Sequence, residues 1–565
     1  MKRRVLLIGA SGTFGSRLAT MLARLPDLEL VLAARRTEPL EALRSSLLEA
    51  GAAADIVVRS FERSRPETLA GIAPWLVVDA AGPFQGSDYS LALAAARHSA
   101  HYVDLADGRD YVAGFAKALD AAAKEAGVLA VTAASSTPAI SHAALAPLVE
   151  GWRSIDQIVV AISPGARAPR GLSVVQAILS YVGQPVRVFL DGRWQSVPGW
   201  SGLRALWMPH LGGRYVSICE TPDLDLLPQH FAVRRDALFM AGLEVAPMHL
   251  GLAVLGLGVR ARLIPSLRPL ARPLRALSGV FALFGSDRGG MTVEAVGRDG
   301  EDRPIRARWA LWAEAGAGPN TPAAPAAALI RALLHGREFA MGATPCVGML
   351  DLDLILRELE HLPVATRVDR ALAESPILFE RLLGPGWEAL PEAVRVVHCG
   401  QSIRASGRAV ARAGKSLAAR GARFFLGLPR SGQHAVSVSI DADASGETWT
   451  RRFGASQFSS RLTDSHQTAI GLFQERFGLL RFTFDMRPAK NGVVWEFVGW
   501  RLFGLPLPVW LAPRIRAGAE DAGGLYRFRV VVAHRWLGLL FAYRGTLVPP
   551  SADATSPPAS AKLPS

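Results

Sequence analysis

Cysteine and lysine are scarce in this chain of 565 residues. The three cysteines, Cys219, Cys346 and Cys399, stand at unrelated spacings, which excludes a disulfide framework and a zinc ribbon. Lysine occurs only six times, so arginine carries almost all of the positive charge behind a formal net charge of +14. That charge suits anionic lipid, a phosphorylated cofactor or an ordinary solvated surface. No RNA-binding signature or metal-ligand spacing accompanies it, and we predict no nucleic-acid partner and no metal site.

Four catalytic motifs are also missing. No tyrosine is followed four positions later by a lysine, which excludes the Tyr-x-x-x-Lys pair of short-chain dehydrogenases. The absence of H-E-x-x-H, G-x-S-x-G and G-x-x-x-x-G-K-[ST] excludes a zinc protease, an α/β-hydrolase and a P-loop ATPase. The chain begins MKRRVLLI, but this apolar run is too short for a signal peptide, and no run approaches the roughly 20 residues of a membrane span. We expect a cytoplasmic protein.

A glycine-rich turn follows the first apolar run. Residues 5–16 read VLLIGASGTFGS, and the pattern after them is helical. A buried strand that leads through glycines into a helix lets the backbone and the helix N-terminus approach a dinucleotide's pyrophosphate. The alternative is an ordinary strand–helix turn. We assign to the phosphate-binding loop Gly9, Ser11, Gly12, Thr13, Phe14 and Gly15.

Two arginines stand where the adenosine ribose would be bound. The second predicted strand, 28–36, reads LELVLAARR and ends in Arg35 and Arg36. An Asp or Glu at this point would bind the ribose 2′-hydroxyl of NAD, whereas arginine pairs with the 2′-phosphate of NADP. We therefore predict NADP(H) in preference to NAD(H). The alternative is that these arginines only begin the next helix.

Strands and helices alternate over the first 145 residues or so. Further strands are predicted at 55–58, at 75–86, at 101–108 and at 128–138, with helices at 89–98 and 111–126. This alternation predicts a doubly wound, Rossmann-like parallel sheet, whose ligands bind at the carboxyl ends of the strands. The cofactor-binding residues that we predict at those ends are Ala81, Gly82, Pro83, Phe84, Asp104 and Ser135.

The order of these motifs resembles a known family. GASGTFG, AARR, DAAGPF, HYVDLADG and ASSTPAIS are similar, in order and spacing, to the NADP-binding domain of saccharopine dehydrogenase-like proteins. Later stretches, SDRGGMTVEAVG and GATPCVGMLDL among them, fit the same group and extend the likeness to about residue 355. The resemblance implies an NADP-dependent oxidoreductase in which the loop after Gly82 faces the nicotinamide and 135–138 line the cleft.

The resemblance leaves the substrate open. The group contains lysine-pathway enzymes and an enoyl reductase of long lipids, and the chain looks closer to the lipid branch. We therefore expect reduction of a hydrophobic enoyl or carbonyl substrate. An amino-acid reductase and a non-catalytic NADP-binding sensor or lipid-binding protein are the alternatives. The candidate proton donors near the cleft are Asp104, Tyr102 and His142, with Asp107 beside them, although Asp104 could equally be a helix cap and His142 structural.

The second region, 146–365, is predicted to be an α+β substrate domain that could also form a homodimer. Strands are expected at 158–162, at 291–296 and at 306–314, and a helix at 325–335. Within it, 246–285 combines leucines with arginines. Such a segment can lie at a membrane surface, pack on the core as a helical hairpin or cover an apolar substrate tunnel.

The third region, 375–548, reads as an antiparallel β-rich domain. Two short helices broken by Gly-Pro-Gly precede alternating runs such as HAVSVSID and LRFTFDM. Stretches such as ETWTRRFG and ERFGLLRFTFDM resemble a bacterial domain family of unknown function that is often fused behind such reductases. The Pro-, Ser- and Ala-rich tail, 549–565, is expected to be disordered.

Overall fold

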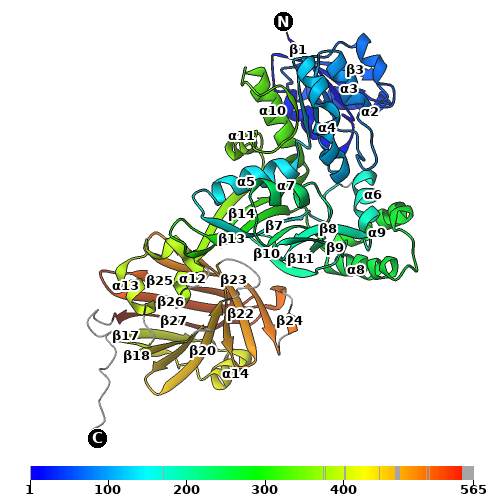
Figure 1. Cartoon of the computed structure of the whole chain (residues 1–565). Coiled ribbons are helices and arrows are strands. Elements are labelled where there is room, and N and C mark those ends of the chain that lie inside the picture. The colour runs from blue at the N-terminus through cyan, green and yellow to red at the C-terminus, as the bar shows by residue number, and fades with distance from the viewer. Residues whose placement is uncertain are drawn as a thin grey trace. The chain divides into compact units, whose positions relative to one another are not determined.

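The computed structural model describes residues 2–169, 171–372, 375, 377–399, 402–443, 446–464, 471–503, 505–507 and 509–549. They belong to two compact units (Figure 1). One unit comprises Met1–Gly300 and Arg308–Val368, and the other comprises Glu301–Ala307 and Asp369–Ser565. The predicted mixed α/β fold class is confirmed.

The N-terminal sheet has seven parallel strands in the order β15-β6-β5-β4-β1-β2-β3. Its strands contain short apolar runs, and most residues of the central strands are buried. Such burial is expected of a parallel sheet that is covered on both faces. The strands are β1 Arg3–Ile8, β2 Leu28–Ala34, β3 Asp55–Ser60, β4 Leu76–Asp79, β5 His101–Asp104, β6 Leu129–Thr132 and β15 Gly342–Pro345. The helices that alternate with them are α1 Thr13–Leu22, α2 Glu38–Glu49, α3 Ser90–Arg97 and α4 Arg109–Glu125.

Strand β15 corrects one predicted boundary. Its residues fall within 146–365, which the sequence assigned to the second domain, yet Gly342 to Pro345 pair with Leu129 to Thr132 of β6. Helix α10 (Ala324–Leu334) also returns and contacts α1. A strand of only four residues gives too little periodic signal to be assigned to a distant sheet from sequence.

The second sheet is mixed and has nine strands, of which seven follow the order β10-β11-β12-β7-β13-β14-β16. The strands are β7 Ser154–Ser163, β8 Pro185–Leu190, β9 Arg193–Pro198, β10 Arg204–Met208, β11 Gly212–Ile218, β12 Asp236–Gly242, β13 Gly289–Arg298, β14 Pro304–Ala313 and β16 Val364–Leu372. Its helices include α5 Ser141–Leu148, α6 Leu172–Tyr181, α7 Asp223–His230 and α11 Leu352–Arg357. The segment 246–285 forms α8 Ala246–Arg260 and α9 Ala271–Phe281. Within the described residues, no helix is long and apolar enough to span a bilayer.

The C-terminal unit is a closed antiparallel sheet. Ten strands form the ring β22-β21-β20-β19-β18-β17-β27-β26-β25-β23, which closes because β22 pairs with β23, and β24 pairs with β23 alone. The strands are β17 Ser402–Ala413, β18 Gly432–Asp443, β19 Gly446–Phe453, β20 Ser456–Asp464, β21 Leu472–Phe477, β22 Leu480–Ala489, β23 Gly492–Leu502, β24 Leu505–Leu507, β25 Arg514–Asp521, β26 Tyr526–His534 and β27 Gly538–Val548. Helices α12 (Leu378–Leu383), α13 (Glu392–Arg395) and α14 (Leu417–Leu426) belong to the same unit.

The interior of the closed sheet is filled by its own side chains. Phe379 stacks on His398 with ring centroids 3.7 Å apart, and both lie against Trp449. The internal space that remains around Trp449 and Tyr543 is about 40 Å³, which holds a few waters and is too small for an organic ligand. The aromatic residues that could have lined a ligand pocket are therefore core. The predicted disordered tail lies almost entirely outside the described residues.

Candidate functional site

The glycine turn between β1 and α1 is closely packed against its own backbone. Gly9 has φ +78°, and a β-carbon on it would lie 2.9 Å from the backbone of Ala80 and Ala81 after β4. A β-carbon on Gly15 would lie 2.2 Å from the Gly9 carbonyl oxygen. The loop therefore needs glycine at both positions, and it brings the ends of β1 and β4 together.

The first turn of α1 is open to a ligand. Its cap residue, Gly12, offers no side-chain hydrogen bond, and the first turn contains no acidic residue. Ser11 and Gly12 are exposed, whereas Thr13 and Phe14 are half-buried. Free backbone N–H groups at the start of this ten-residue helix suit an anion such as a pyrophosphate. Arg35 and Arg36 follow β2 in the same row of loops, and both are exposed.

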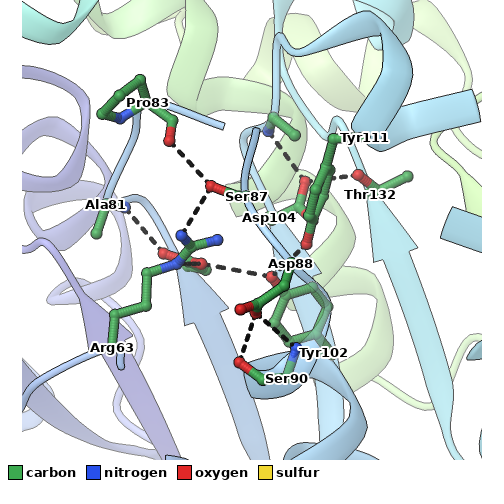
Figure 2. Close-up of polar contacts among 12 residues, drawn as sticks. Arg63, Ala81, Pro83, Ser87, Asp88, Ser90, Tyr102, Asp104, Tyr111 and Thr132 are labelled. Atoms are coloured by element: carbon green, nitrogen blue, oxygen red, sulfur yellow. Dashed lines mark hydrogen bonds and ion pairs between the residues drawn. The ribbon is translucent and has the colours of Figure 1, made fainter. Parts of the chain in front are cut away.

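A buried carboxylate holds the loop after β4. Asp79 Oδ2 accepts a hydrogen bond from Arg63 Nε at 2.6 Å, and Asp79 Oδ1 accepts one from the Ala81 amide at 3.0 Å (Figure 2). Arg63 also donates to Ser87 Oγ at 3.0 Å, and Ser87 in turn donates to the Pro83 carbonyl at 3.1 Å. Although Arg63 opposes the effect, complete burial raises the pKa of Asp79.

This network was not predicted from the sequence. It shapes the loop that contains Ala81, Gly82, Pro83 and Phe84, in which Gly82 is exposed and Phe84 is buried. The Arg63 guanidinium also lies 5.1 Å from the centre of the Phe84 ring. The one feature of the sequence that could have indicated this network is the acidic residue, Asp79, at the end of the apolar run WLVVD.

Asp104 joins the ends of β5 and β6. Its Oδ1 accepts a hydrogen bond from the Thr132 hydroxyl at 2.8 Å (Figure 2). The same oxygen accepts two more, from the Ala133 amide at 2.7 Å and the Ala106 amide at 3.0 Å. Its Oδ2 is buried and has no hydrogen-bond partner among the described residues. Complete burial outweighs these bonds and raises the pKa of Asp104 to about 7. Asp104 is not a helix cap, because Gly108 caps α4.

Tyr102 lies on the same strand but belongs to the packing beneath the loops. Its hydroxyl is 3.5 Å from Asp79 Oδ2 and 3.4 Å from the Tyr111 hydroxyl (Figure 2). The side chain is 1% exposed, and burial raises its pKa well above 10. Tyr102 therefore remains protonated at neutral pH and stabilises the Asp79 network.

His142 lies on α5 at the junction of the first two sheets. Its Nε2 is 3.7 Å from Asp223 Oδ1, and the Ser141 hydroxyl lies 3.0 Å from the same oxygen. Rings of His230 and Phe231 pack on it with centroids 5.4 and 5.3 Å away. Burial lowers the pKa of His142 to about 3, so the imidazole is neutral, and burial raises the pKa of Asp223 to about 7. Ser135, at the start of the preceding turn, is half-buried.

Two further contacts lie near the same edge, one between the first two sheets and one within the second sheet and its helices. Arg109, at the start of α4, donates from Nε and Nη2 to the two carboxylate oxygens of Asp225 on α7, each at 2.6 Å. Beside it, the Tyr181 hydroxyl lies 2.6 Å from Cys219 Sγ in full burial. Burial raises the pKa of Cys219 to about 12, so this thiol is unreactive at neutral pH. Neither contact is predictable from local sequence, since both depend on residues that are far apart in the chain.

The geometry fits a dinucleotide. The glycine turn supplies free amides, the loop after β2 supplies two cations, and the loops after β4, β5 and β6 adjoin it along one edge of the sheet. Residues 5–131 match the family described as the saccharopine dehydrogenase NADP binding domain. The N-terminal part of the chain therefore contains a saccharopine dehydrogenase-like NADP-binding domain.

Residues 390–547, behind the saccharopine dehydrogenase-like part, match DUF4166, a domain of unknown function. Among solved structures, the chain is similar to saccharopine dehydrogenase (L-Glu forming) from Saccharomyces cerevisiae, at 12% identity over 65% of this chain and 99% of that one, with a TM-score of 0.48. A DAP dehydrogenase of C. glutamicum is similar at 14% identity over 63% of this chain and 98% of that one, with a TM-score of 0.35. No curated protein matches the chain.

Proposed function

We propose that this protein is an NADP(H)-dependent oxidoreductase that prefers NADP(H) to NAD(H). The pair Arg35 and Arg36 carries the proposal, because it stands in the turn after β2 where sites for NAD place a carboxylate. Both side chains are exposed, and within the described residues neither has an ion-pair partner. A guanidinium there can form a charge-assisted, bidentate contact with a 2′-phosphate.

Titration of NADPH and NADH, followed by nicotinamide fluorescence, tests this preference. We expect the double variant Arg35→Ala/Arg36→Ala to bind NADPH about tenfold or more weakly, because a lost charge-assisted contact costs about 1.5–3 kcal/mol, and to bind NADH almost unchanged. Arg97→Ala, an exposed position on α3, is the matched control. Equal affinity of the unmodified protein for NADH and NADPH would contradict the proposal.

The reaction that we propose is hydride transfer, in which bound NADP(H) supplies or takes the hydride at its nicotinamide ring. Asp104 is the proposed proton-handling group, because its Oδ2 has no hydrogen-bond partner among the described residues. With a pKa of about 7, its carboxyl populates both forms near neutral pH. Tyr102 and His142 suit this role less, since Tyr102 is held protonated and His142 is held neutral by burial.

NADPH oxidation across a panel of enones, acyl thioesters and 2-oxo acids with amines separates this proposal from its alternatives. Turnover of the apolar compounds supports reduction of a hydrophobic substrate, whereas turnover limited to the 2-oxo acids favours an amino-acid reductase. NADPH binding without any turnover favours a sensor.

A hydrophobic substrate is supported by helices α8 and α9. The segment 246–285 contains no Asp or Glu, and it exposes large apolar side chains, among them Leu263 at 80%, Leu283 at 74% and Phe284 at 79%. Its exposed arginines are Arg260, Arg262, Arg268, Arg272 and Arg275. Exposed apolar groups among cations are typical of contact with an anionic membrane surface, and we propose that the substrate reaches the protein from such a surface.

Flotation with phosphatidylglycerol and phosphatidylcholine vesicles tests the membrane contact. We expect binding to the anionic vesicles and a loss of about tenfold or more in the variant Leu283→Ser/Phe284→Ser, which removes two apolar side chains from the interface. Leu417→Ser, an equally exposed leucine on α14, should bind like the unmodified protein. Failure to bind anionic vesicles would rule out this contact.

A further inference from the structure

The outer face of the closed sheet carries a hollow lined by arginines. The hollow has a volume of about 980 Å³ and crosses β18, β17, β27, β26, β25 and β23. The arginines that line it are Arg408, Arg516, Arg527, Arg529 and Arg544, and all of them are exposed. The large inward-facing side chains of the same strands, such as Trp495 and Tyr543, are buried and do not line the hollow, which places it on the outer side of the sheet.

The strand register places these arginines side by side. Arg529 of β26 stands directly opposite Arg544 of β27, and Thr546 stands opposite both Arg408 and Arg527. On the next strand, Arg529 faces Gly518, which has no side chain to fill the space between. Like charges directly opposite each other on neighbouring strands are destabilising, so the bare protein bears a free-energy cost at this place.

The acidic residues nearby offset this charge only in part. Glu520 is the single acidic residue among the described residues that line the hollow, and it pairs with Arg527 at 3.3 Å, while Glu496, opposite Arg516, pairs with Arg487. The other four arginines have no ion-pair partner among the described residues. Thr546, Gln433 and Asn491 add hydrogen-bonding groups to the lining.

We infer that this hollow binds a small soluble molecule that carries several phosphate groups. Its volume falls within the roughly 300–1,000 Å³ of small-molecule sites. Guanidinium groups bind phosphate oxygens through paired, charge-assisted hydrogen bonds, and a multiply charged anion would offset the repulsion between Arg529 and Arg544. A concave face of this size favours a compact anion over a membrane surface. The inference concerns the C-terminal unit and is independent of the function proposed above.

Calorimetric titration of the full chain with sodium tripolyphosphate tests this binding. We expect saturable binding that weakens as salt is added, and a loss of about tenfold or more in Arg529→Gln/Arg544→Gln. Arg404→Gln, an exposed arginine of β17 outside the hollow, is the matched control and should bind normally. With the nucleotide site filled by saturating NADPH, Arg35→Gln/Arg36→Gln should also bind tripolyphosphate normally, because these residues do not line the hollow. If that second pair abolishes binding while Arg529→Gln/Arg544→Gln retains it, the inference is overturned.

Two further measurements keep the inference testable. Without ligand, Arg544→Gln should raise the melting temperature by about 1–3 °C, since it removes a cross-strand repulsion, and tripolyphosphate should stabilise the unmodified chain but not this variant. Binding of RNA or anionic vesicles that depends on Arg529 and Arg544, and that tripolyphosphate does not displace, would instead assign the hollow to a macromolecule or a membrane and overturn the small-molecule inference.

Discussion

The parallel nucleotide sheet and the closed antiparallel sheet differ in how they use polar residues. In the parallel sheet, the strands are apolar, and the polar groups gather where β4 and β5 end, at Asp79 and Asp104. In the closed sheet, polar and apolar side chains alternate, so charges occur along whole strands on both faces. Its interior holds the ion pair of Arg451 and Glu475, while arginines cover its outer face. The proposed ligand sites therefore lie at strand ends in one sheet and on a strand face in the other.

The largest expected effect tests the buried charge inside the closed sheet. Arg451 Nη2 lies 3.2 Å from Glu475 Oε1, and Ser460 contacts both side chains. Arg451→Met would leave Glu475 buried without a cation, and we expect a loss of about 3–5 kcal/mol in the free energy of unfolding. Arg452→Met, whose side chain is exposed, is the control. Denaturant unfolding followed by tryptophan fluorescence measures the change, and a loss below about 1 kcal/mol would show that the interior tolerates an unpaired charge.

The second effect concerns the buried carboxyl of Asp104 at the edge of the parallel sheet. The pKa of Asp104 is about 7 in the folded chain against an ordinary 3.8, so between these values the folded chain holds a proton that the unfolded chain releases. Asp104 should therefore lower the free energy of unfolding as pH rises from about 4 to 7, by up to roughly 4 kcal/mol, and contribute no further change above that, while the buried neutral His142 contributes in the opposite direction below about pH 6.5.

Asp104→Asn should reduce this slope, because its amide does not titrate and its carbonyl can still accept the three hydrogen bonds. Part of the slope should remain, since Asp223 also has a raised pKa of about 7. Urea unfolding at pH 4.5 and pH 7.5 measures it, with Asp110→Asn as an exposed control. An unchanged slope in Asp104→Asn would contradict the assignment.

The smallest effect concerns the glycine turn of the parallel sheet. A substitution there should weaken NADPH binding and leave the stability of the closed sheet unchanged. A β-carbon on Gly15 would meet the Gly9 carbonyl oxygen at 2.2 Å, so Gly15→Ala must displace the turn. We expect NADPH binding to weaken roughly 100-fold, which corresponds to about 2.7 kcal/mol, while the unfolding transition of the C-terminal unit stays unchanged. Gly71→Ala, where a β-carbon would meet nothing within 4 Å, is the control. Unaltered NADPH affinity in Gly15→Ala would contradict the placement of the phosphates at this turn.

The same contrast explains which strands could be predicted. Strands β2, β4, β5 and β6 lie within the predicted ranges, and β1 and β3 extend two residues beyond theirs, because each contains a short apolar run that a local pattern reveals. Strand β17 reads SIRASGRAVARA, and its inward residues include Ala405, Ala409 and Ala411. Alanine between arginines has neither the bulk nor the β-branching that indicates a strand, so β17 was not predicted, and neither were β21, β24 and β25.

The candidate site was partly visible in the sequence. The glycine positions and the Arg35–Arg36 pair could be predicted, because they depend on local backbone geometry and a short sequence motif indicates that geometry directly. The partners of Asp79 and Asp104 depend on contacts between strands and loops that the sequence does not place. Arg63 reaches Asp79 across a separation of 16 residues, and Arg109 reaches Asp225 across 116. No local sequence pattern predicts such pairs.

The sequence by itself determined the parallel nucleotide sheet, its glycine turn and the family of its NADP-binding domain, because periodicity, glycine spacing and motif order are local properties. Only the tertiary structure decided that β15 returns to this sheet, that Asp104 keeps one oxygen without a partner, and that the closed sheet has a filled interior and an arginine-lined outer face. These features depend on burial and on the register between distant strands, which set a pKa and bring like charges together only once the chain has folded.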